Sequence, residues 1–377
     1  MKKTMIAMIL VGGRGTRLGE ITNEIAKPAV SFGAKYRLID FTLSNLTNSY
    51  IDTCGIVTQY EPFELMNYIG SGTSWDLDFI DGGVKFLTPY SRKENILWQK
   101  GTAHAIKQYF RFIKSYNTSY VLILSGDHIY KMDYQKMLKH HINSKAGITI
   151  AANEVDISEA NRFGILEVDK EDLVTGFEEK PKKPKSNLAS MGIYIFSVDI
   201  LEDLLNKASD KDIDFGKNII PKAIQNDKRV VVYKYAGYWR DVGTIKSLYD
   251  CNMDLLDDPD FLSLNISKTL PIYSKSLNLN PHVMLRKGKA IQSVIADGCL
   301  INGKVVHSTI AYSVVINANS EVINSVILPD VKIGYSVFLH NVIVNKGVLI
   351  PDNYRCDARD VTLITDENLF EVGGIYE

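Results

Sequence analysis

Residues 5–18 read MIAMILVGGRGTRL, an apolar run that ends in a glycine-rich loop. The apolar residues 5–11 predict a buried β-strand, because so short a run cannot cross a membrane. Glycines in residues 12–15 let the backbone approach a phosphate closely, and Arg17 can add a bidentate, charge-assisted contact. Leu18 stands where a dinucleotide-binding fingerprint has its third glycine, and no Gly-Lys-Ser/Thr closes a Walker A loop. The loop is therefore either a phosphate-binding loop of another kind or a structural turn.

This strand opens an alternation of short β-rich runs and longer helical stretches over the first two-thirds of the chain. The apolar spacing predicts further strands at 55–58, 120–124, 148–152, 174–177 and 192–196, and helices at 36–48, 102–116 and 134–144. Such alternation is typical of parallel βαβ units, so we expect a doubly wound, Rossmann-like α/β domain with a mostly parallel sheet. Ligands bind such sheets at the C-terminal strand ends, where the loop at 12–15 and Asp127 both lie.

The sequence changes character after a helix predicted at 246–256. From about Gly288 charged residues become sparse, and short apolar pairs such as Val294-Ile295 and Val326-Ile327 recur between turn residues. Short strands at nearly hexapeptide steps predict a left-handed β-helix, with a small β-sandwich as the alternative on periodicity alone. We therefore expect the α/β domain at 1–245, a helix and extended linker at 246–285, and the β-helix with a C-terminal tail at 286–377.

The bulk properties limit the partners. A chain of 377 residues with net charge −1 is long enough for about two domains, and it offers no electrostatic reason to expect nucleic acid or a membrane as partner. The four cysteines are far apart and form no CxxC pattern, which argues against a zinc site or a disulfide framework. Isolated thiols fit a reducing compartment, so we expect a cytoplasmic protein.

Two aspartates are candidate metal ligands. Asp127 comes directly after the strand at 120–124, where it can hold a divalent metal or cap the next helix. Asp241 lies in residues 238–244 (YWRDVGT). Because Mg²⁺ is typically held by one or two carboxylates together with phosphate oxygens and water, the pair predicts a shared Mg²⁺ site. We expect the neighbouring His128 to be a hydrogen-bonded structural histidine.

Two lysines, a glutamate and a serine are further candidates for binding the substrates. Lys27 precedes a proline, which favours an extended backbone that can aim its side chain into the site, although a solvated lysine is the alternative. In Glu179-Lys180-Pro181, the lysine can pair with a sugar phosphate while the glutamate accepts sugar hydroxyls. Ser190 can bind substrate or simply be a buried strand residue. No nucleophile–base pair stands out, which favours direct displacement at phosphorus.

Taken in order along the chain, these motifs resemble the sugar-nucleotide pyrophosphorylase family. Residues 35–45 (KYRLIDFTLSN), 125–134 (SGDHIYKMDY) and 189–194 (ASMGIY) are similar to the bacterial glucose-1-phosphate adenylyltransferases of glycogen synthesis. The resemblance covers essentially the whole chain. It implies an enzyme that joins ATP and glucose 1-phosphate into ADP-glucose and pyrophosphate with Mg²⁺, in a homotetramer or in a heterotetramer with a related regulatory subunit.

The resemblance also implies a role for each matching residue. The catalytic set that neutralises the phosphates and holds Mg²⁺ is Arg17, Lys27, Asp127 and Asp241. The nucleotide-binding set is Gly12, Gly13, Gly15, Thr16 and Gly126. The glucose 1-phosphate set is Gln99, Gly164, Glu179, Lys180 and Ser190. Positions linked to communication with a regulatory site are Gln59 and Trp98.

Three residues depart from the family pattern. Val11 replaces an alanine before the first glycine pair and adds bulk near the loop. Gln99 stands where relatives commonly have a tyrosine, so its sugar-phosphate contact is carried over only weakly. Glu24 replaces a lysine found in strongly activated relatives; because a carboxylate repels an anionic effector, we predict weak or absent activation by fructose bisphosphate.

Three alternatives stay open. The same fold and chemistry can serve another nucleotide, as in a uridylyl- or thymidylyltransferase. A non-catalytic regulatory subunit is a second alternative, against which the complete catalytic set argues. An acyltransferase β-helix is weaker, because His307 and His340 are isolated and expected at the surface or in turns.

Overall fold

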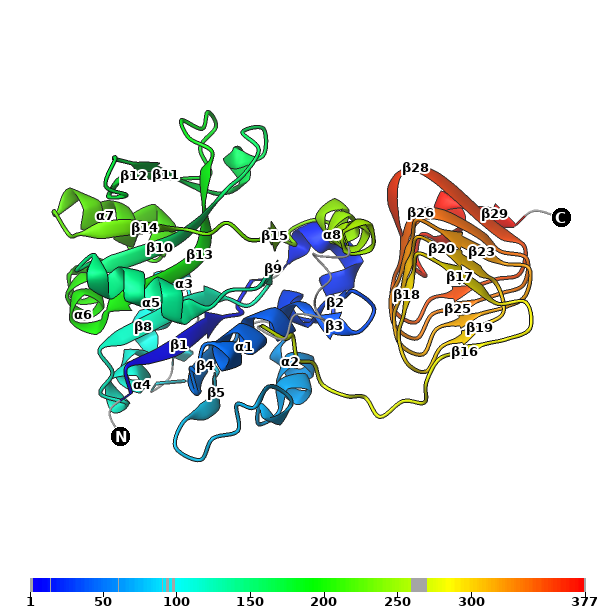
Figure 1. Ribbon diagram of the computed structural model, residues 1–377, viewed down its shortest axis with the longest axis horizontal. Helices are drawn as coiled ribbons and strands as arrows, with labels where there is room; N and C mark the ends of the chain where they lie inside the picture. The colour runs from blue at the N-terminus through cyan, green and yellow to red at the C-terminus, as the bar shows by residue number, and fades with distance from the viewer. Residues whose placement is uncertain are drawn as a thin grey trace.

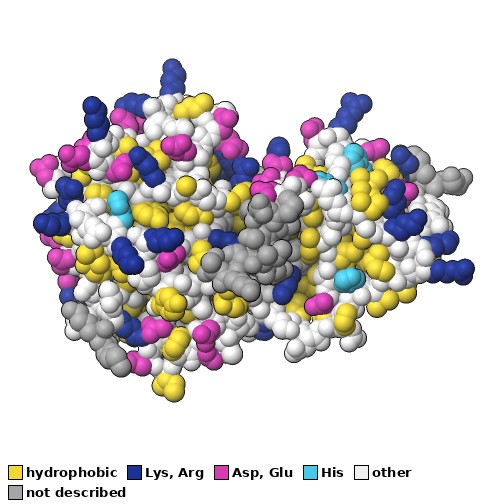
Figure 2. All heavy atoms as spheres, in the orientation of Figure 1, with side chains coloured by type: hydrophobic (Ala, Val, Ile, Leu, Met, Phe, Trp, Pro, Cys, Tyr) yellow, Lys and Arg dark blue, Asp and Glu magenta, His cyan; other side chains and the backbone are white. Residues whose placement is uncertain are grey.

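A computed structural model describes residues 3–13, 15–59, 61–89, 91–92, 95–96, 99–258 and 270–375. Figure 1 shows two bodies, an α/β domain and a stack of short strands, with helix α8 (Ile245–Asp257) lying between them. The chain reaches the second body through an extended segment. The face in Figure 2 carries basic and acidic side chains intermixed over the α/β domain.

A nine-stranded mixed sheet forms the centre of the α/β domain. Its strands are β1 (Met5–Leu10), β4 (Thr53–Val57), β5 (Gly83–Leu87), β8 (Tyr120–Ser125), β10 (Ile148–Glu154), β11 (Gly164–Val168), β12 (Val174–Glu179), β13 (Leu188–Ser197) and β14 (Val230–Lys234). The run β8-β1-β4-β5 is parallel, as is the pair β10/β14. Strand β13 runs antiparallel to β8, β10 and β11, and β12 runs antiparallel to β11. The parallel run β8-β1-β4-β5 is the part of the sheet that matches the expected Rossmann-like arrangement, and the glycine-rich loop follows its strand β1.

Helices cover both faces of this sheet. They are α1 (Leu38–Asn48), α2 (Pro62–Ile69), α3 (Thr102–Gln108), α4 (Phe110–Ser115), α5 (Tyr134–Asn143), α6 (Val198–Lys207) and α7 (Ile220–Gln225). Side chains alternate across a strand, so Ala7 and Ile9 of β1 pack with α1, α2 and α5, whereas Ile6 and Met8 pack with α3, α4, α6 and α7. The doubly wound arrangement predicted from the alternation is confirmed.

The helix predicted at 102–116 is interrupted in the structure. Tyr109 leaves helical geometry, with φ −103° and ψ 17°, between α3 and α4. Its ring is buried and its hydroxyl donates to the carbonyl oxygen of Thr88. A buried tether to a distant segment is a tertiary effect that helical spacing does not reveal.

Short elements connect and edge these layers. They are η1 (Thr16–Thr22), η2 (Lys27–Ala29), β2 (Ser31–Phe32), β3 (Tyr36–Arg37), η3 (Thr73–Trp75), β6 (Ser91–Arg92), β7 (Asn95–Ile96), β9 (His128–Tyr130), η4 (Ala160–Arg162), η5 (Phe215–Ile219) and β15 (Trp239–Asp241). The predicted strand at 192–196 extends back to Leu188, and the helix predicted from Tyr36 begins at Leu38.

The second body is a left-handed β-helix of hexapeptide coils, as predicted, and not a sandwich. Its strands are β16 (Val283–Met284), β17 (Lys289–Ile291), β18 (Val294–Ile295), β19 (Leu300–Ile301), β20 (Lys304–Val306), β21 (Thr309–Ile310), β22 (Val315–Ile316), β23 (Glu321–Ile323), β24 (Val326–Ile327), β25 (Lys332–Ile333), β26 (Phe338–Val344), β27 (Leu349–Ile350) and β28 (Tyr354–Ile364), followed by α9 (Leu369–Val372) and β29 (Gly374–Ile375). From β16 to β28, equivalent strands of successive coils pair in parallel at spacings of 15 or 17 residues, except that the second half of β26 pairs with β28 at a spacing of 20; β29 runs antiparallel to β28.

The coil corners explain the polar residues between the apolar pairs. Asn319, Ser336 and Asn353 occupy one corner of successive coils, and all three have positive φ. Asparagine tolerates this left-handed conformation better than most residues. The inward side chains, including Val322 and Leu339, form one continuous apolar core.

Helix α8 joins the two bodies. Leu248 and Leu255 share an apolar cluster with Val326 and Ile343 of the β-helix and with Phe41 of α1. Buried hydrogen bonds also connect α8 to both bodies: the Asn252 side-chain oxygen accepts from Gly33 N–H at 3.0 Å and from the Thr309 hydroxyl at 3.1 Å. Within the described ranges, no helix combines the length and apolarity that crossing a bilayer requires.

Candidate active site

A cavity of about 600 Å³ lies where β1, β8, β12 and β13 present their loops or ends. This volume is within the usual range for small-ligand pockets. Predicted site residues that line it are Gly12, Gly13, Lys27, Gln59, Gln99, Asp127, Gly164, Glu179, Lys180, Ser190 and Asp241. Arg17, Gly15, Thr16 and Gly126 are not among the lining residues, and Trp98 lies outside the described residues.

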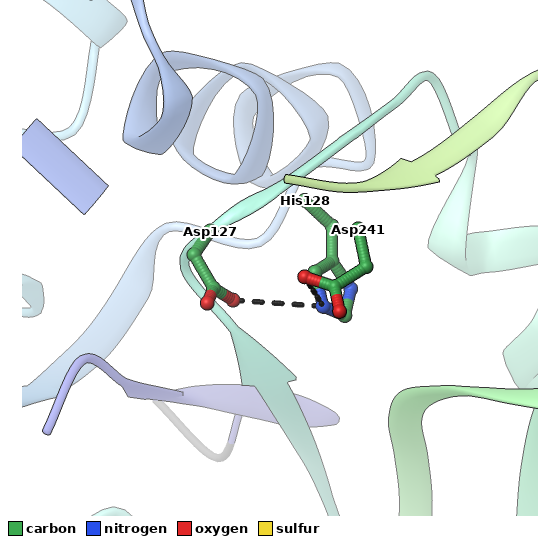
Figure 3. A group of neighbouring side chains, drawn as sticks. All are labelled: Asp127, His128 and Asp241. Atoms are coloured by element: carbon green, nitrogen blue, oxygen red, sulfur yellow. Dashed lines mark ion pairs between the residues drawn. The ribbon is translucent and has the colours of Figure 1, made fainter. Parts of the chain in front are cut away.

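The two aspartates meet because two short strands pair. Asp127 follows β8, and Asp241 ends β15, which runs antiparallel to β9 with Asp241 opposite His128. One ligand atom from each of Asp127, His128 and Asp241 lies within 4.8 Å of the others. Figure 3 shows the three side chains directed toward one another. Carboxylate oxygens at this separation suit a hard divalent cation.

Lys27 lies between the two carboxylates. Its ammonium nitrogen is 2.6 Å from Asp127 Oδ2 and 2.9 Å from Asp241 Oδ1. Only 10% of its side chain is exposed, so the alternative of a solvated lysine is wrong. Burial would lower the pKa of Lys27, but the two carboxylates outweigh burial and hold that pKa above its usual value. All three groups are therefore charged near neutral pH.

The pKa values of the two aspartates are shifted by the same ion pairs. Burial favours their neutral form, yet the adjacent Lys27 ammonium outweighs burial and holds the pKa of both Asp127 and Asp241 below the usual range. Ser125 also donates its hydroxyl to Asp127 Oδ1 in a short hydrogen bond. The cluster presents two partly buried negative charges and one positive charge to the cavity.

His128 has the structural role expected of it. The Trp239 indole N–H donates to its Nδ1 at 3.4 Å, and the two rings pack edge to face at 5.6 Å. An Nδ1 that accepts leaves the proton of the neutral imidazole on Nε2, which lies 3.6 Å from both Asp127 and Asp241. A metal-ligating histidine instead usually donates through its second nitrogen. The ligand chemistry therefore falls to the two carboxylates.

Glu179 and Lys180 lie at the other side of the cavity. Gly164 pairs with Glu179 across β11 and β12, and a Cβ on Gly164 would come within 2.9 Å of Glu179 Oε2. A Cβ on Gly216 would come within 2.8 Å of the same oxygen. These two glycines make room for the carboxylate. Lys180 places its ammonium 3.4 Å from Glu179 Oε1 and remains largely exposed, free to reach an anionic ligand.

Ser190 lies in β13 beneath this side of the cavity. Its side-chain oxygen accepts from Gly192 N–H at 3.3 Å and lies 3.5 Å from the Tyr194 hydroxyl. The residue is mostly buried yet lines the cavity. Ser190 is thus both a strand residue and an available hydrogen-bonding group.

Gln59 and Gln99 cover the glycine-rich loop. The Gln59 amide donates to the Gln99 carbonyl oxygen at 3.1 Å, and the Gln99 amide donates to the Thr58 carbonyl oxygen at 3.3 Å. A Cβ on Gly12 would be 3.5 Å from Gln99 Oε1 and 3.6 Å from Gln59. Gln99 was assigned to the sugar phosphate by resemblance, and the structure places it against the nucleotide loop.

Three predicted residues that do not line the cavity, Arg17, Gly15 and Gly126, lie next to residues that do. Arg17 is exposed, with its guanidinium beside Gly243, where a Cβ would be 3.1 Å from Arg17 and 3.2 Å from Asp241 Oδ2. Gly15 has φ +66°, and a Cβ there would press within 3.2 Å of the Lys27 side chain. A Cβ on Gly126 would overlap Val11 at 2.7 Å. Gly126 thus permits close packing under the loop.

Asp214 is a cavity residue that no motif in the sequence indicated. This residue lines the cavity, where its carboxylate accepts from the Thr102 hydroxyl at 3.0 Å and from Lys217 N–H at 3.1 Å. Its only sequence signal is an Asp-Phe-Gly turn at 214–216 between two apolar stretches. That signal is too common to have identified a site residue.

Comparisons with known proteins agree with this geometry. Residues 6–258 match the family model described as nucleotidyl transferase, and residues 280–372 match the model described as GlmU-like, C-terminal hexapeptide. The chain is 49% identical over 372 residues to the glucose-1-phosphate adenylyltransferase of Bacillus cytotoxicus, an alignment that covers 97% of this chain and 99% of the relative. Glucose-1-phosphate adenylyltransferases of Bacillus mycoides and Bacillus cereus are 48% identical with the same coverage.

Proposed function

We propose a reaction for this chain from its family: the chain belongs to the glucose-1-phosphate adenylyltransferases, and its cavity is built for their chemistry. In this reaction ATP and α-D-glucose 1-phosphate form ADP-glucose and pyrophosphate, and the ADP-glucose supplies glycogen synthesis. The observation that carries the proposal is the Lys27–Asp127–Asp241 cluster, which shares one cavity with Glu179, Lys180 and Ser190. One wall suits polyphosphate, and the other suits a sugar phosphate.

The phosphate side of the cavity would bind ATP. Nucleotidyltransferases generally use a divalent metal, and we assign Mg²⁺ to Asp127 and Asp241, whose oxygens are the hard ligands that this ion prefers. When bound, Mg²⁺ would neutralise charge on the phosphates. Lys27 adds positive charge within the cavity, and Arg17 would add a second charge from beside Gly243, outside the lining. Gly12 and Gly13 let the backbone come close to the nucleotide.

The opposite side would orient glucose 1-phosphate. Glu179 and Ser190 offer acceptors and a donor for sugar hydroxyls, and Lys180 offers a cation for the phosphate. A phosphate oxygen of the sugar then attacks the α-phosphorus of ATP. One phosphorus–oxygen bond forms as the bond to pyrophosphate breaks, so no covalent enzyme intermediate is required. Such a reaction depends mainly on positioning and charge stabilisation.

Pyrophosphate release tests this proposal. Purified protein would be given glucose 1-phosphate and Mg²⁺ with ATP, UTP, dTTP, CTP or GTP, with Asp127→Ala alongside. We expect release with ATP and its loss in the variant. Preference for another nucleotide would move the chain to a sister activity. No release with any nucleotide, in folded protein, would contradict catalysis and favour a regulatory subunit.

We propose that the chain acts in a tetramer, either of identical copies or together with a related regulatory chain. The first coil of the β-helix supports an interface, because β16 and β17 are edge strands and Val283, Met284, Leu285 and Ile291 are exposed. Apolar side chains along an open strand edge are typical of contact surfaces. Light scattering would give the mass. A monomer at all concentrations, alone and with a related chain, would contradict the proposal.

We also place the enzyme in the cytoplasm. Its four cysteines, Cys54, Cys251, Cys299 and Cys356, are free and buried, which suits a reducing compartment. Fractionation of cells that produce the protein would test the location, and recovery with the membrane or exported fraction would contradict it.

A further inference from the structure

The Lys27 ammonium occupies the position between the two carboxylates. It contacts Asp127 Oδ2 at 2.6 Å and Asp241 Oδ1 at 2.9 Å, so it bridges one oxygen of each aspartate. The remaining Asp127 oxygen accepts from Ser125. The remaining Asp241 oxygen lies on the side of Gly243 and Arg17. A cation shared by both aspartates must therefore compete with Lys27.

The backbone of Lys27 is held by the short helix, whereas its side chain is held by the two ion pairs and lines the cavity. The residue opens η2, where Ala29 N–H donates to the Ala26 carbonyl oxygen and Val30 N–H donates to the Lys27 carbonyl oxygen. Pro28 adds rigidity, and Lys27, Pro28 and Ala29 are all buried. The four methylenes of the lysine can still rotate, because the cavity is open in front of the ammonium. Movement of the ammonium thus requires no change of fold.

The charges explain when the ammonium would move. Without ligand, Lys27 offsets one of the two partly buried negative charges. A divalent cation alone would have to enter beside a positive charge that already holds the carboxylates. Nucleotide phosphates change the balance, because they attract the ammonium and also coordinate the cation.

We propose that Lys27 is an internal counter-cation that occupies the metal position in the free enzyme and transfers to the nucleotide phosphates when the metal–nucleotide complex binds. This inference rests on the proposed function and adds an order of binding to it: the divalent cation alone binds weakly, and the nucleotide brings it in. Lys27 thereby prevents the two carboxylates from retaining a cation in the absence of nucleotide.

Metal binding without turnover tests the proposal. Free Mn²⁺ would be titrated by electron paramagnetic resonance against wild type, Lys27→Met and Lys27→Gln, with no nucleotide present. We expect at least tenfold tighter binding in both variants, because the competing charge is gone. Lys100→Met is the matched control, since Lys100 lines the same cavity without an ion pair to either aspartate, and it should bind as wild type does. Adding Asp127→Asn to Lys27→Met should abolish the gain.

Two results would overturn the proposal. One is Mn²⁺ affinity in folded Lys27→Met and Lys27→Gln that is equal to or weaker than that of wild type. The other needs only wild type: Mn²⁺ alone binding as tightly as Mn²⁺ in the presence of a non-reacting ATP analogue. Neither result depends on catalysis. Failure of the nucleotidyl transfer itself appears instead in the pyrophosphate assay, so the two failures are distinguishable.

Discussion

The β-helix and the active-site cluster are stabilised in opposite ways. The β-helix core is apolar, and its inward side chains stack from coil to coil at spacings of 15 or 17 residues, as in Ile301, Ile316 and Ile333. The cluster brings together a buried lysine at position 27 and two partly buried aspartates at positions 127 and 241, and the pairing of β9 with β15 brings the two aspartates to one place. The repeats of the β-helix stabilise it and can be recognised in the sequence. The active-site cluster forms only when the complete α/β domain has folded. A substitution should therefore affect stability in the first region and chemistry in the second.

The largest expected effect is on chemistry. On the proposed function, Asp241→Asn should lower kcat by about a thousandfold, since it removes one of the two carboxylates that pair with Lys27 and to which we assign the metal. Pyrophosphate release would measure it. Asp357→Asn is the matched control, because Asp357 pairs with His340 on the β-helix surface. Equal activity of the two variants would remove the distinction between the regions.

A substitution in the β-helix core should instead lower stability and leave the chemistry unchanged. Leu339→Ala should lower the free energy of unfolding by about 3 kcal/mol, because Leu339 is fully buried between coils and its truncation leaves a cavity. Below the unfolding transition, kcat should change little. Urea unfolding would measure it, with Leu349→Ala as control, since Leu349 is 61% exposed. A loss in Leu349→Ala as large as that in Leu339→Ala would contradict this account.

His141 is a buried group without a charged partner, in contrast to the charged active-site cluster, and it should make stability depend on pH. His141 is bonded to Thr149 at 2.8 Å and to Ser197 at 3.2 Å, and burial lowers its pKa to about 4. Because the unfolded chain takes up this proton near its ordinary pKa of 6.5, stability should be complete above that pH and fall as pH drops toward 4, by about 3 kcal/mol at most. Urea unfolding at several pH values would show a shallower dependence in His141→Gln; an unchanged dependence would assign the effect elsewhere.

The smallest expected effect is at Glu24, an exposed residue of the loop before Lys27. Fructose bisphosphate should change the rate or substrate affinity of wild type by less than tenfold, since a carboxylate repels the anion and exposed charges contribute only about 1 kcal/mol. Glu24→Lys should increase the response. Initial rates with and without the effector would decide, and a tenfold or larger response in wild type would show the prediction to be wrong.

Periodic and local features were predictable. The apolar spacing located α5 and β8 to within a residue or two, and the recurring valine and isoleucine pairs identified the β-helix. The antiparallel direction of β13 and the break at Tyr109 were not predictable, because strand partners and buried tethers depend on segments far away in the chain. Asp214 was missed for the same reason, since only the fold brings it to the cavity.

The sequence by itself determined the two architectures, the glycine-rich loop and the identity of the charged residues, because these follow from local spacing and from motifs. Only the tertiary structure decided that Lys27 is buried between Asp127 and Asp241 and that His128 points its Nε2 at them. The physical reason is the pairing of β9 with β15, two three-residue strands more than a hundred positions apart. Strands so short carry almost no local signal, and their partnership is set by the packing of the whole domain.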